Sequence, residues 1–157
     1  MIIYEPTTDI EFITKCVTNP VVWRACVDDG MVDVMPEVFF VPTDGKLWLR
    51  AGDYGLFVGE PRNMVTYEVH TMLLPEARGK AVDIAKGALH WVFYNTPCLK
   101  IITHVPSFNV LARRLSERCG MTFIGNNESS FLKDGVLYDQ FIYGVSKGDL
   151  CQFHLQQ

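Results

Sequence analysis

The sequence lacks the features that mark several large classes of protein. No apolar run in its 157 residues approaches the roughly 18 needed to cross a bilayer. The first residues, Met1–Pro6, carry no basic segment ahead of an apolar one, so we expect no secretory signal. There is no internal repeat and no low-complexity segment. The net charge is −4 at pH 7 and no segment is strongly basic, which argues against a nucleic-acid partner.

Cysteine and histidine are present without the spacing of a metal site. The five cysteines are scattered and never spaced as C-x-x-C, so we expect reduced thiols, mostly in the core of a cytoplasmic protein. The four histidines show no H-E-x-x-H pattern, and we predict no metal. A hydrophobic share of 48% is typical of an ordinary globular chain. We expect one domain over residues 1–147 and a loosely ordered tail over 148–157.

The spacing of apolar residues predicts an α+β fold, an α/β sandwich in which helices flank a mixed, mostly antiparallel sheet. Thr8 and Glu11 form a capping box ahead of a first short helix. Turns such as Asp44-Gly45 then separate three or four strands, which predicts an antiparallel meander. Helix and strand alternate afterwards. The expected helices run up to residue 19 and over 21–27, 82–94 and 109–119; the expected strands cover 37–41, 46–51, 54–58, 64–74, 99–105, 121–124 and 136–145.

The segment Glu76–Ala81 joins a strand to a helix through a glycine, and this arrangement favours an anion site. Amides at the start of a helix have no partner within it and carry a partial positive charge. Gly79 has no side chain to block a phosphate, while Arg78 and Lys80 add two cations. An ordinary loop with solvated basic residues is the alternative.

A second segment, Asn109–Met121, starts with a polar residue that can cap a helix or reach a ligand. Gly120 near its end suits a left-handed helix C-cap. The apolar stripe predicted for this helix consists of Leu111, Ala112, Leu115 and Cys119.

Taken together and in this order, the two segments resemble the GNAT superfamily of N-acetyltransferases. In that family a strand leads into an R/Q-x-x-G-x-G/A loop, and a helix of the form N-x-x-A-x-x-L-Y-E-x-x-G-F follows later. Here the loop reads E-A-R-G-K-A and the helix reads N-V-L-A-R-R-L-S-E-R-C-G-M. The likeness covers residues 64–147. The N-terminal segments Asn19–Trp23 and Asp28–Gly30 look like small GNAT-like proteins encoded by tailed bacteriophages.

The resemblance implies an enzyme that moves acetyl directly from acetyl-CoA to an amine. The acceptor stays open between a small molecule and a protein, and a homodimer is common in the family. The implied location is the cytoplasm, or the host cytoplasm if the protein is phage-encoded. The implied cofactor-binding residues are Met72, Leu73 and Leu74 for the pantetheine arm, and Arg78, Gly79, Lys80, Ala81 and Asn109.

Two positions depart from the family pattern. Glu76 stands where the family has Gln or Arg, and a carboxylate repels a pyrophosphate. Ser116 stands where many members have a Tyr that protonates the leaving thiolate. A non-catalytic GNAT-fold protein, either a CoA-binding sensor or a phage-associated interaction module, is therefore the alternative function. An unrelated α+β ligand-binding domain is a third reading.

A base is needed because only a neutral amine attacks a thioester. Glu68 and His70 lie two residues apart on the expected central strand, so both point to one face, where family members place an acidic base. His104 ends the next strand. Each has a structural alternative, an exposed strand carboxylate for Glu68 and hydrogen-bonded structural roles for the histidines. The candidate catalytic residues are thus Glu68, His70, His104 and Ser116, with Tyr138 and Tyr143 as other sources of an acid.

Many aromatic residues lie in the N-terminal half of the chain. We expect most of them in the core, although they could also line an apolar acceptor pocket. These residues are Trp23, Phe39, Phe40, Trp48, Tyr54 and Phe57.

Overall fold

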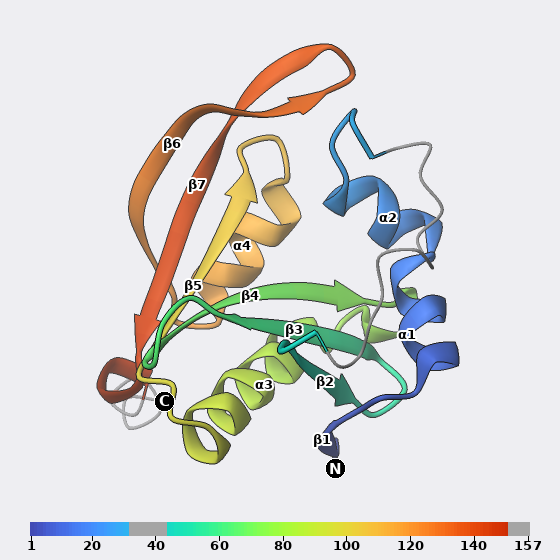
Figure 1. The fold of residues 1–157 in the computed structure, drawn as a ribbon, viewed down its shortest axis with the longest axis vertical. Coiled ribbons are helices and arrows are strands. Elements are labelled where there is room, and N and C mark those ends of the chain that lie inside the picture. The colour runs from blue at the N-terminus through green and yellow to red at the C-terminus, as the bar shows by residue number, and fades with distance from the viewer. Residues whose placement is uncertain (32–43, 151–157) are drawn as a thin grey trace.

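The computed structural model describes residues 1–31 and 44–150, and these build one seven-stranded sheet with helices on both faces (Figure 1). The strand order is β1-β2-β3-β4-β5-β7-β6. Of the neighbouring pairs in this sheet, only β4 and β5 are parallel. The predicted α+β fold is confirmed. The strands are β1 (Tyr4–Pro6), β2 (Leu47–Ala51), β3 (Gly55–Pro61), β4 (Thr66–Leu73), β5 (Lys100–Pro106), β6 (Thr122–Lys133) and β7 (Val136–Ser146).

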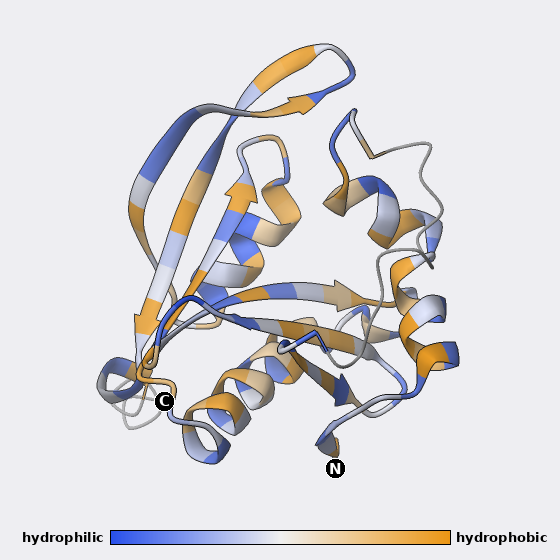
Figure 2. Cartoon of the chain, in the orientation of Figure 1, coloured by the Kyte–Doolittle hydropathy of each residue, from blue (hydrophilic) through white to orange (hydrophobic). Residues whose placement is uncertain are grey.

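The helices divide between the two faces of the sheet and bury two separate apolar clusters. They are α1 (Ile10–Val17), α2 (Pro20–Cys26), the short η2 (Pro75–Ala77), α3 (Ala81–Asn95) and α4 (Val110–Arg118). The larger cluster joins α3 and α4 to the sheet, and the smaller one lies under α1. Trp48 of β2 belongs to the smaller cluster and Leu49 to the larger, because alternate strand residues point to opposite faces. Figure 2 shows the resulting mixture of apolar and polar segments along the strands.

Two predicted helix ends can be compared with the structure. The N-cap of α1 is Asp9, whose side chain accepts a hydrogen bond from Phe12 N at 3.0 Å, so the capping box predicted from Thr8 is wrong. Asp9 caps the helix in place of Thr8 because its charged carboxylate interacts favourably with the positive end of the helix. At the end of α4, Gly120 has a φ of +91° and its amide bonds to Glu117 O, which confirms the predicted left-handed C-cap.

Other differences arise from contacts that are distant in sequence. The strand β1 is short enough to give no periodic signal, and it forms because Tyr4–Pro6 pairs with β2. The expected strand 37–41 lies outside the described residues. The last strands form a longer hairpin than predicted. Leu150 is buried in the larger cluster, so the chain is packed past residue 147; residues 151–157 lie outside the described part.

The apolar stripe predicted for α4 is partly wrong. Leu111 is 80% exposed, whereas Ser116, on the same helix, is buried. Ser116 tolerates burial because its hydroxyl donates to Ala112 O at 3.0 Å and leaves no unsatisfied polar group. Cys119 is buried as predicted.

The central strands β4 and β5 separate partway along their length. Their pairing ends at Glu68 opposite Ile102, although β4 continues to Leu73 and β5 to Pro106. Figure 1 shows β5 turning away from β4, with α2 above the opening. None of the helices in the described ranges has the length and hydropathy needed to cross a membrane.

Candidate active site

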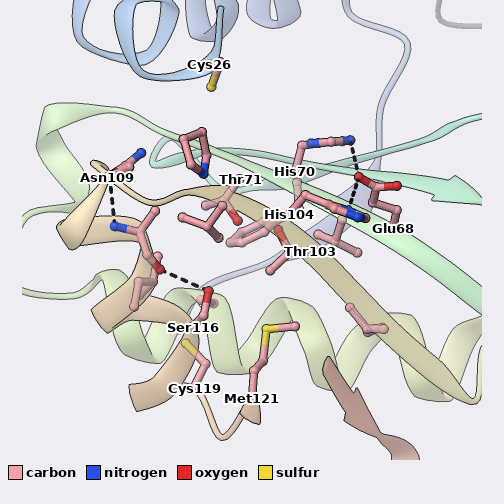
Figure 3. A pocket seen from close by; sticks show the side chains of 18 of the residues that line it. Cys26, Glu68, His70, Thr71, Thr103, His104, Asn109, Ser116, Cys119 and Met121 are labelled. Carbon is pink, nitrogen blue, oxygen red and sulfur yellow. Dashed lines mark hydrogen bonds and ion pairs between the residues drawn. The ribbon is translucent and has the colours of Figure 1, made fainter. Parts of the chain in front are cut away.

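A cavity of about 310 Å³ fills the opening between β4 and β5 and passes through the sheet (Figure 3). On the α2 side its wall includes Cys26, His70 and His104. On the opposite side it reaches Leu89 of α3 and Cys119, the C-cap of α4. The cavity exists because two parallel strands that stop pairing leave a gap that neither cluster fills.

Three of the predicted catalytic residues meet on one wall of this cavity. Glu68 is a buried residue of β4 and its Oε1 lies 3.0 Å from Nδ1 of His104 on β5. His70 Nε2 lies 3.9 Å from the same oxygen, which is longer than a hydrogen bond. The predicted common face of Glu68 and His70 is therefore confirmed, and the exposed strand position considered for Glu68 is wrong. Figure 3 shows the two imidazoles on either side of the carboxylate.

The other oxygen of Glu68 is held by Arg62, which the sequence did not single out. Arg62 donates to Glu68 Oε2 from Nε at 2.7 Å and also from Nη2, and its Nη1 lies 3.2 Å from Glu60. Glu60 and Glu68 are directly opposed in the β3–β4 ladder. Two opposed carboxylates repel each other, and a cation that bridges them removes the repulsion. The pairing register of these strands would have pointed to Arg62.

These contacts set the charge of the cluster. Burial raises the pKa of Glu68, but the hydrogen bonds from Arg62 and the charges of His104, His70 and Arg62 outweigh it, so this pKa lies below its usual value. Burial lowers the pKa of His70, and together with the charges of Arg62 and His104 it outweighs the opposite effect of the Glu68 and Glu60 carboxylates, so this pKa lies below its usual value. At neutral pH the cluster therefore contains an ionised Glu68 and an uncharged His70.

The loop after β4 leads into α3 through a tight turn. Gly79 has a φ of +82°, which only glycine adopts without strain, while a Cβ there would meet nothing within 4 Å. The requirement for glycine is therefore conformational. The first intrahelical bond of α3 runs from Ile84 N to Lys80 O, so the amides of Ala81, Val82 and Asp83 precede it and can bind an anion.

The side chains around this turn are arranged unevenly. Lys80 Nζ lies 3.0 Å from the hydroxyl of Tyr54, so this cation is directed toward the turn between β2 and β3. Arg78 has no ion pair with any residue in the described ranges. Glu76 and Asp83 are exposed carboxylates on either side of the anion-binding amides, and both oppose a bound phosphate.

The three residues predicted to contact the pantetheine arm have their side chains packed in or against the apolar clusters. Met72 and Leu74 pack in the smaller cluster and Leu73 packs against the larger one. Packing thus engages these three side chains, whereas the main-chain edge of β4 that faces β5 remains next to the cavity. Leu74 N already donates to Tyr54 O at 2.9 Å.

The α4 wall carries the remaining predicted residues. Asn109 caps α4, its Oδ1 accepting from Ala112 N at 3.1 Å, and it also lines the cavity. Ser116 lines the cavity too, but its hydroxyl proton is donated to Ala112 O, as Figure 3 shows. Burial raises the pKa of Cys119 to about 11, which keeps this thiol protonated and unreactive at neutral pH.

A wide groove lies next to the cavity, between α2, the first turn of α4 and the β6–β7 hairpin. Ala25 and Asn109 line both spaces, so the groove adjoins the cavity. The groove is largely apolar, with Trp23, Phe108 and Tyr138 in its wall. Phe57 lines the cavity, Trp48 lies in the core, and Phe39 and Phe40 lie outside the described residues.

The two alternative acids lie in different surroundings. Tyr143 is fully buried and its hydroxyl donates to Glu117 at 3.2 Å, away from the cavity wall. Tyr138 faces the groove and stacks edge-on against Phe108, with ring centroids 4.7 Å apart. Within residues 1–31 and 44–150, no three His, Cys, Asp or Glu side chains are grouped to hold a metal ion.

Comparison with known proteins identifies the fold. No protein-family model and no curated protein matches the sequence. Spermidine N-acetyltransferase from Vibrio cholerae, solved with CoA and spermine, aligns over 96% of this chain and 98% of its own, with a TM-score of 0.71 and 18% identity. A GNAT-family acetyltransferase from Bacillus anthracis aligns over 94% and 95%, with a TM-score of 0.66 and 17% identity. This chain therefore has the GNAT fold.

Proposed function

We propose that this protein is an N-acetyltransferase that moves acetyl from acetyl-CoA to an amine by direct attack. The observation that carries the proposal is the cavity between β4 and β5, which brings Glu68, His70 and His104 together in a sheet of the GNAT fold. Such a space admits a thioester from one side of the sheet and an amine from the other.

Acetyl-CoA is held mainly by the main chain. The pyrophosphate lies on Arg78, Gly79, Lys80 and Ala81, where the free amides of α3 offset the repulsion from Glu76 and Asp83. The pantetheine arm follows the edge of β4 at Met72, Leu73 and Leu74 and reaches Asn109. The groove beside Trp23 and Phe108 then receives the body of the acceptor.

The four predicted catalytic residues, Glu68, His70, His104 and Ser116, all line the cavity. An amine at its ordinary pKa of about 10 is almost wholly protonated at pH 7, so a base and a partly dry cavity are needed to release its lone pair. Glu68 and the two histidines supply that environment. Ser116 lies next to the site but gives its proton to Ala112 O, so the departing thiolate takes a proton from the amine or from water.

Ligand binding tests the proposal first. A thermal-shift titration with acetyl-CoA, CoA and ADP should raise the melting temperature with the first two, since a ligand at about 100 times its Kd adds about 2.7 kcal/mol. Release of CoA on adding amines then measures turnover. An unchanged melting temperature at millimolar acetyl-CoA would overturn the proposal.

A non-catalytic protein of the same fold is the second candidate. The observation that favours it is the engaged hydroxyl of Ser116, which leaves the family's acid position without a free proton donor. A CoA-binding sensor would show the thermal shift without CoA release. An interaction module would show neither.

Three narrower expectations belong with the proposal. A phage origin follows from the N-terminal residues, a cytoplasmic location from the scattered thiols, and a homodimer from the resemblance. Each stays a prediction. Light scattering at several concentrations measures the oligomeric state directly.

A further inference from the structure

We propose that His104 is the base that takes the proton from the acceptor amine, and that Glu68 and Arg62 are positioning residues that hold its imidazole. This inference rests on the proposed acetyl transfer and assigns separate roles within the Glu68 cluster. It follows from how the hydrogen bonds of three side chains are distributed.

Both oxygens of Glu68 are already in use. Oε2 accepts from Nε and Nη2 of Arg62, and Oε1 lies 3.0 Å from His104 Nδ1. The side chain of Glu68 is only 8% exposed, so water reaches it poorly. A carboxylate that accepts several charge-assisted hydrogen bonds is stabilised as the anion and gains little from a proton. Glu68 is therefore suited to hold a neighbour and poorly suited to take a proton.

The same contacts fix which nitrogen of His104 carries the proton. An ionised carboxylate can only accept a hydrogen bond, so Nδ1 of His104 must donate to Glu68. The proton of the neutral imidazole then sits on Nδ1, and Nε2, on the other side of the ring, keeps a lone pair. His104 lines the cavity with 26% of its side chain exposed, and the proposal directs this lone pair at an amine bound there.

His70 lacks this arrangement. Its Nε2 lies 3.9 Å from Glu68, which is too long for a hydrogen bond, so the carboxylate does not select its tautomer. The remaining titratable groups on the cavity wall are the exposed Cys26 and the buried Cys119. The pKa of each thiol lies above its usual value, so both are already protonated at neutral pH and neither takes a proton. Among the described groups, His104 is the one that combines a free lone pair with a fixed orientation.

The proton balance of the reaction is complete with this residue. An acceptor that enters as an ammonium gives one proton to His104 Nε2, and the freed nitrogen attacks the acetyl carbonyl carbon. The C–N bond forms and the C–S bond breaks. The second nitrogen proton goes to the departing thiolate, so CoA leaves as the thiol. The histidinium then returns its proton to water.

Turnover of matched histidine variants tests the assignment. The probes are spermidine, Nα-acetyl-lysine and trialanine, with CoA release as the readout. We expect His104→Ala to lower kcat about 100-fold or more with an unchanged KM for acetyl-CoA, and added imidazole to restore part of it. His70→Ala should cost far less, and His90→Ala, an exposed residue of α3, should cost nothing.

A full rate in His104→Ala, or a larger loss in His70→Ala, would overturn the assignment while leaving the acetyltransferase proposal intact. Nitrogen-15 NMR of the free protein gives a readout that needs no substrate. We expect His104 to carry its proton on Nδ1 at neutral pH, and Glu68→Gln to make both tautomers visible. A wild-type proton on Nε2 would contradict the inference even if no probe amine were acetylated.

Discussion

At the scale of single residues, backbone conformation decides whether the loop between β4 and α3 can bind an anion. The sequence points to Gly79 because it has no side chain to block a phosphate, whereas the structure gives this residue open space and a positive φ. The anion-binding amides belong mostly to Ala81, Val82 and Asp83. The loop motif predicts a phosphate site here, while the free donors depend on where the helix starts.

Replacing Gly79 by Glu should weaken CoA binding at least tenfold, about 1.4 kcal/mol. The new carboxylate repels the pyrophosphate, and a side chain at a φ of +82° strains the turn. Isothermal titration calorimetry measures the change. Gly45→Glu is the matched control, because Gly45 has a φ of +83° and equally open surroundings but lies away from the loop. Equal affinity for CoA in both variants would contradict the proposal that the pyrophosphate binds at this turn.

At the scale of elements, segments far apart in sequence fix one another through a few specific contacts. The hydroxyl of Tyr4 in β1 donates to Ile84 O of α3 at 2.9 Å, and its ring packs over Gly87. Asp29, after α2, accepts from Asp134 N at 2.7 Å and from Gly135 N at 2.8 Å in the β6–β7 turn. The first contact attaches the edge strand, and the second connects two walls of the groove.

We expect Gly87→Ala to destabilise the protein by about 1–3 kcal/mol, because the added Cβ would overlap the Tyr4 hydroxyl. Helix propensity alone predicts the opposite, a gain of about 1 kcal/mol. Urea unfolding separates the two effects. In a Tyr4→Ala background the overlap is gone, and the same substitution should stabilise. An identical effect on stability in both backgrounds would show that the loss caused by Gly87→Ala does not come from overlap with Tyr4.

Asp29→Asn should loosen the β6–β7 turn, since an amide offers one acceptor oxygen where the carboxylate offers two. The two backbone hydrogen bonds hold the pKa of Asp29 below its usual value. The carboxylate therefore contributes stability above the unfolded-state pKa, and this contribution disappears as pH falls through the lower folded-state pKa.

Unfolding of wild type and Asp29→Asn across pH measures this contribution. The difference in stability should be constant near neutral pH and vanish in strong acid. Asp28→Asn serves as the control, because within the described residues the Asp28 side chain accepts a hydrogen bond from Gly30 N of its own turn and none from the β6–β7 turn. A difference that persists at the acid end would contradict the assignment of the bonds to the ionised form.

At the scale of the whole molecule, the two ends of the described chain pack into the same domain. Residues 1–147 were expected to form the domain, but Leu150 is buried in the larger cluster beside α3. The same sheet contains β1, which lies near the start of the chain, and β7, which lies near its end.

Leu150→Ala should therefore lower the free energy of unfolding by about 2–5 kcal/mol, the usual cost of removing a buried leucine side chain. Leu137→Ala is the comparison, because Leu137 is exposed and its loss should cost no more than about 0.5 kcal/mol. Differential scanning calorimetry of both variants tests this. Equal melting temperatures would mean that the chain past residue 147 adds nothing to the fold.

The α+β class, most of the helices and strands, and the loop and helix that resemble the GNAT pattern can be predicted from the sequence alone. Periodicity, turns and caps are short-range, so a few neighbouring residues encode them. The sequence also placed Glu68 and His70 on one face, because strand alternation is local.

The tertiary structure decided the rest. Where β4 and β5 stop pairing, how Arg62 reaches Glu68, and which nitrogen of His104 faces the carboxylate all depend on strand register between distant segments. The exposure of Leu111 and burial of Ser116 depend likewise on how α4 meets the sheet. Local composition cannot encode these features, because the energies that select them arise only when residues far apart in the chain come into contact.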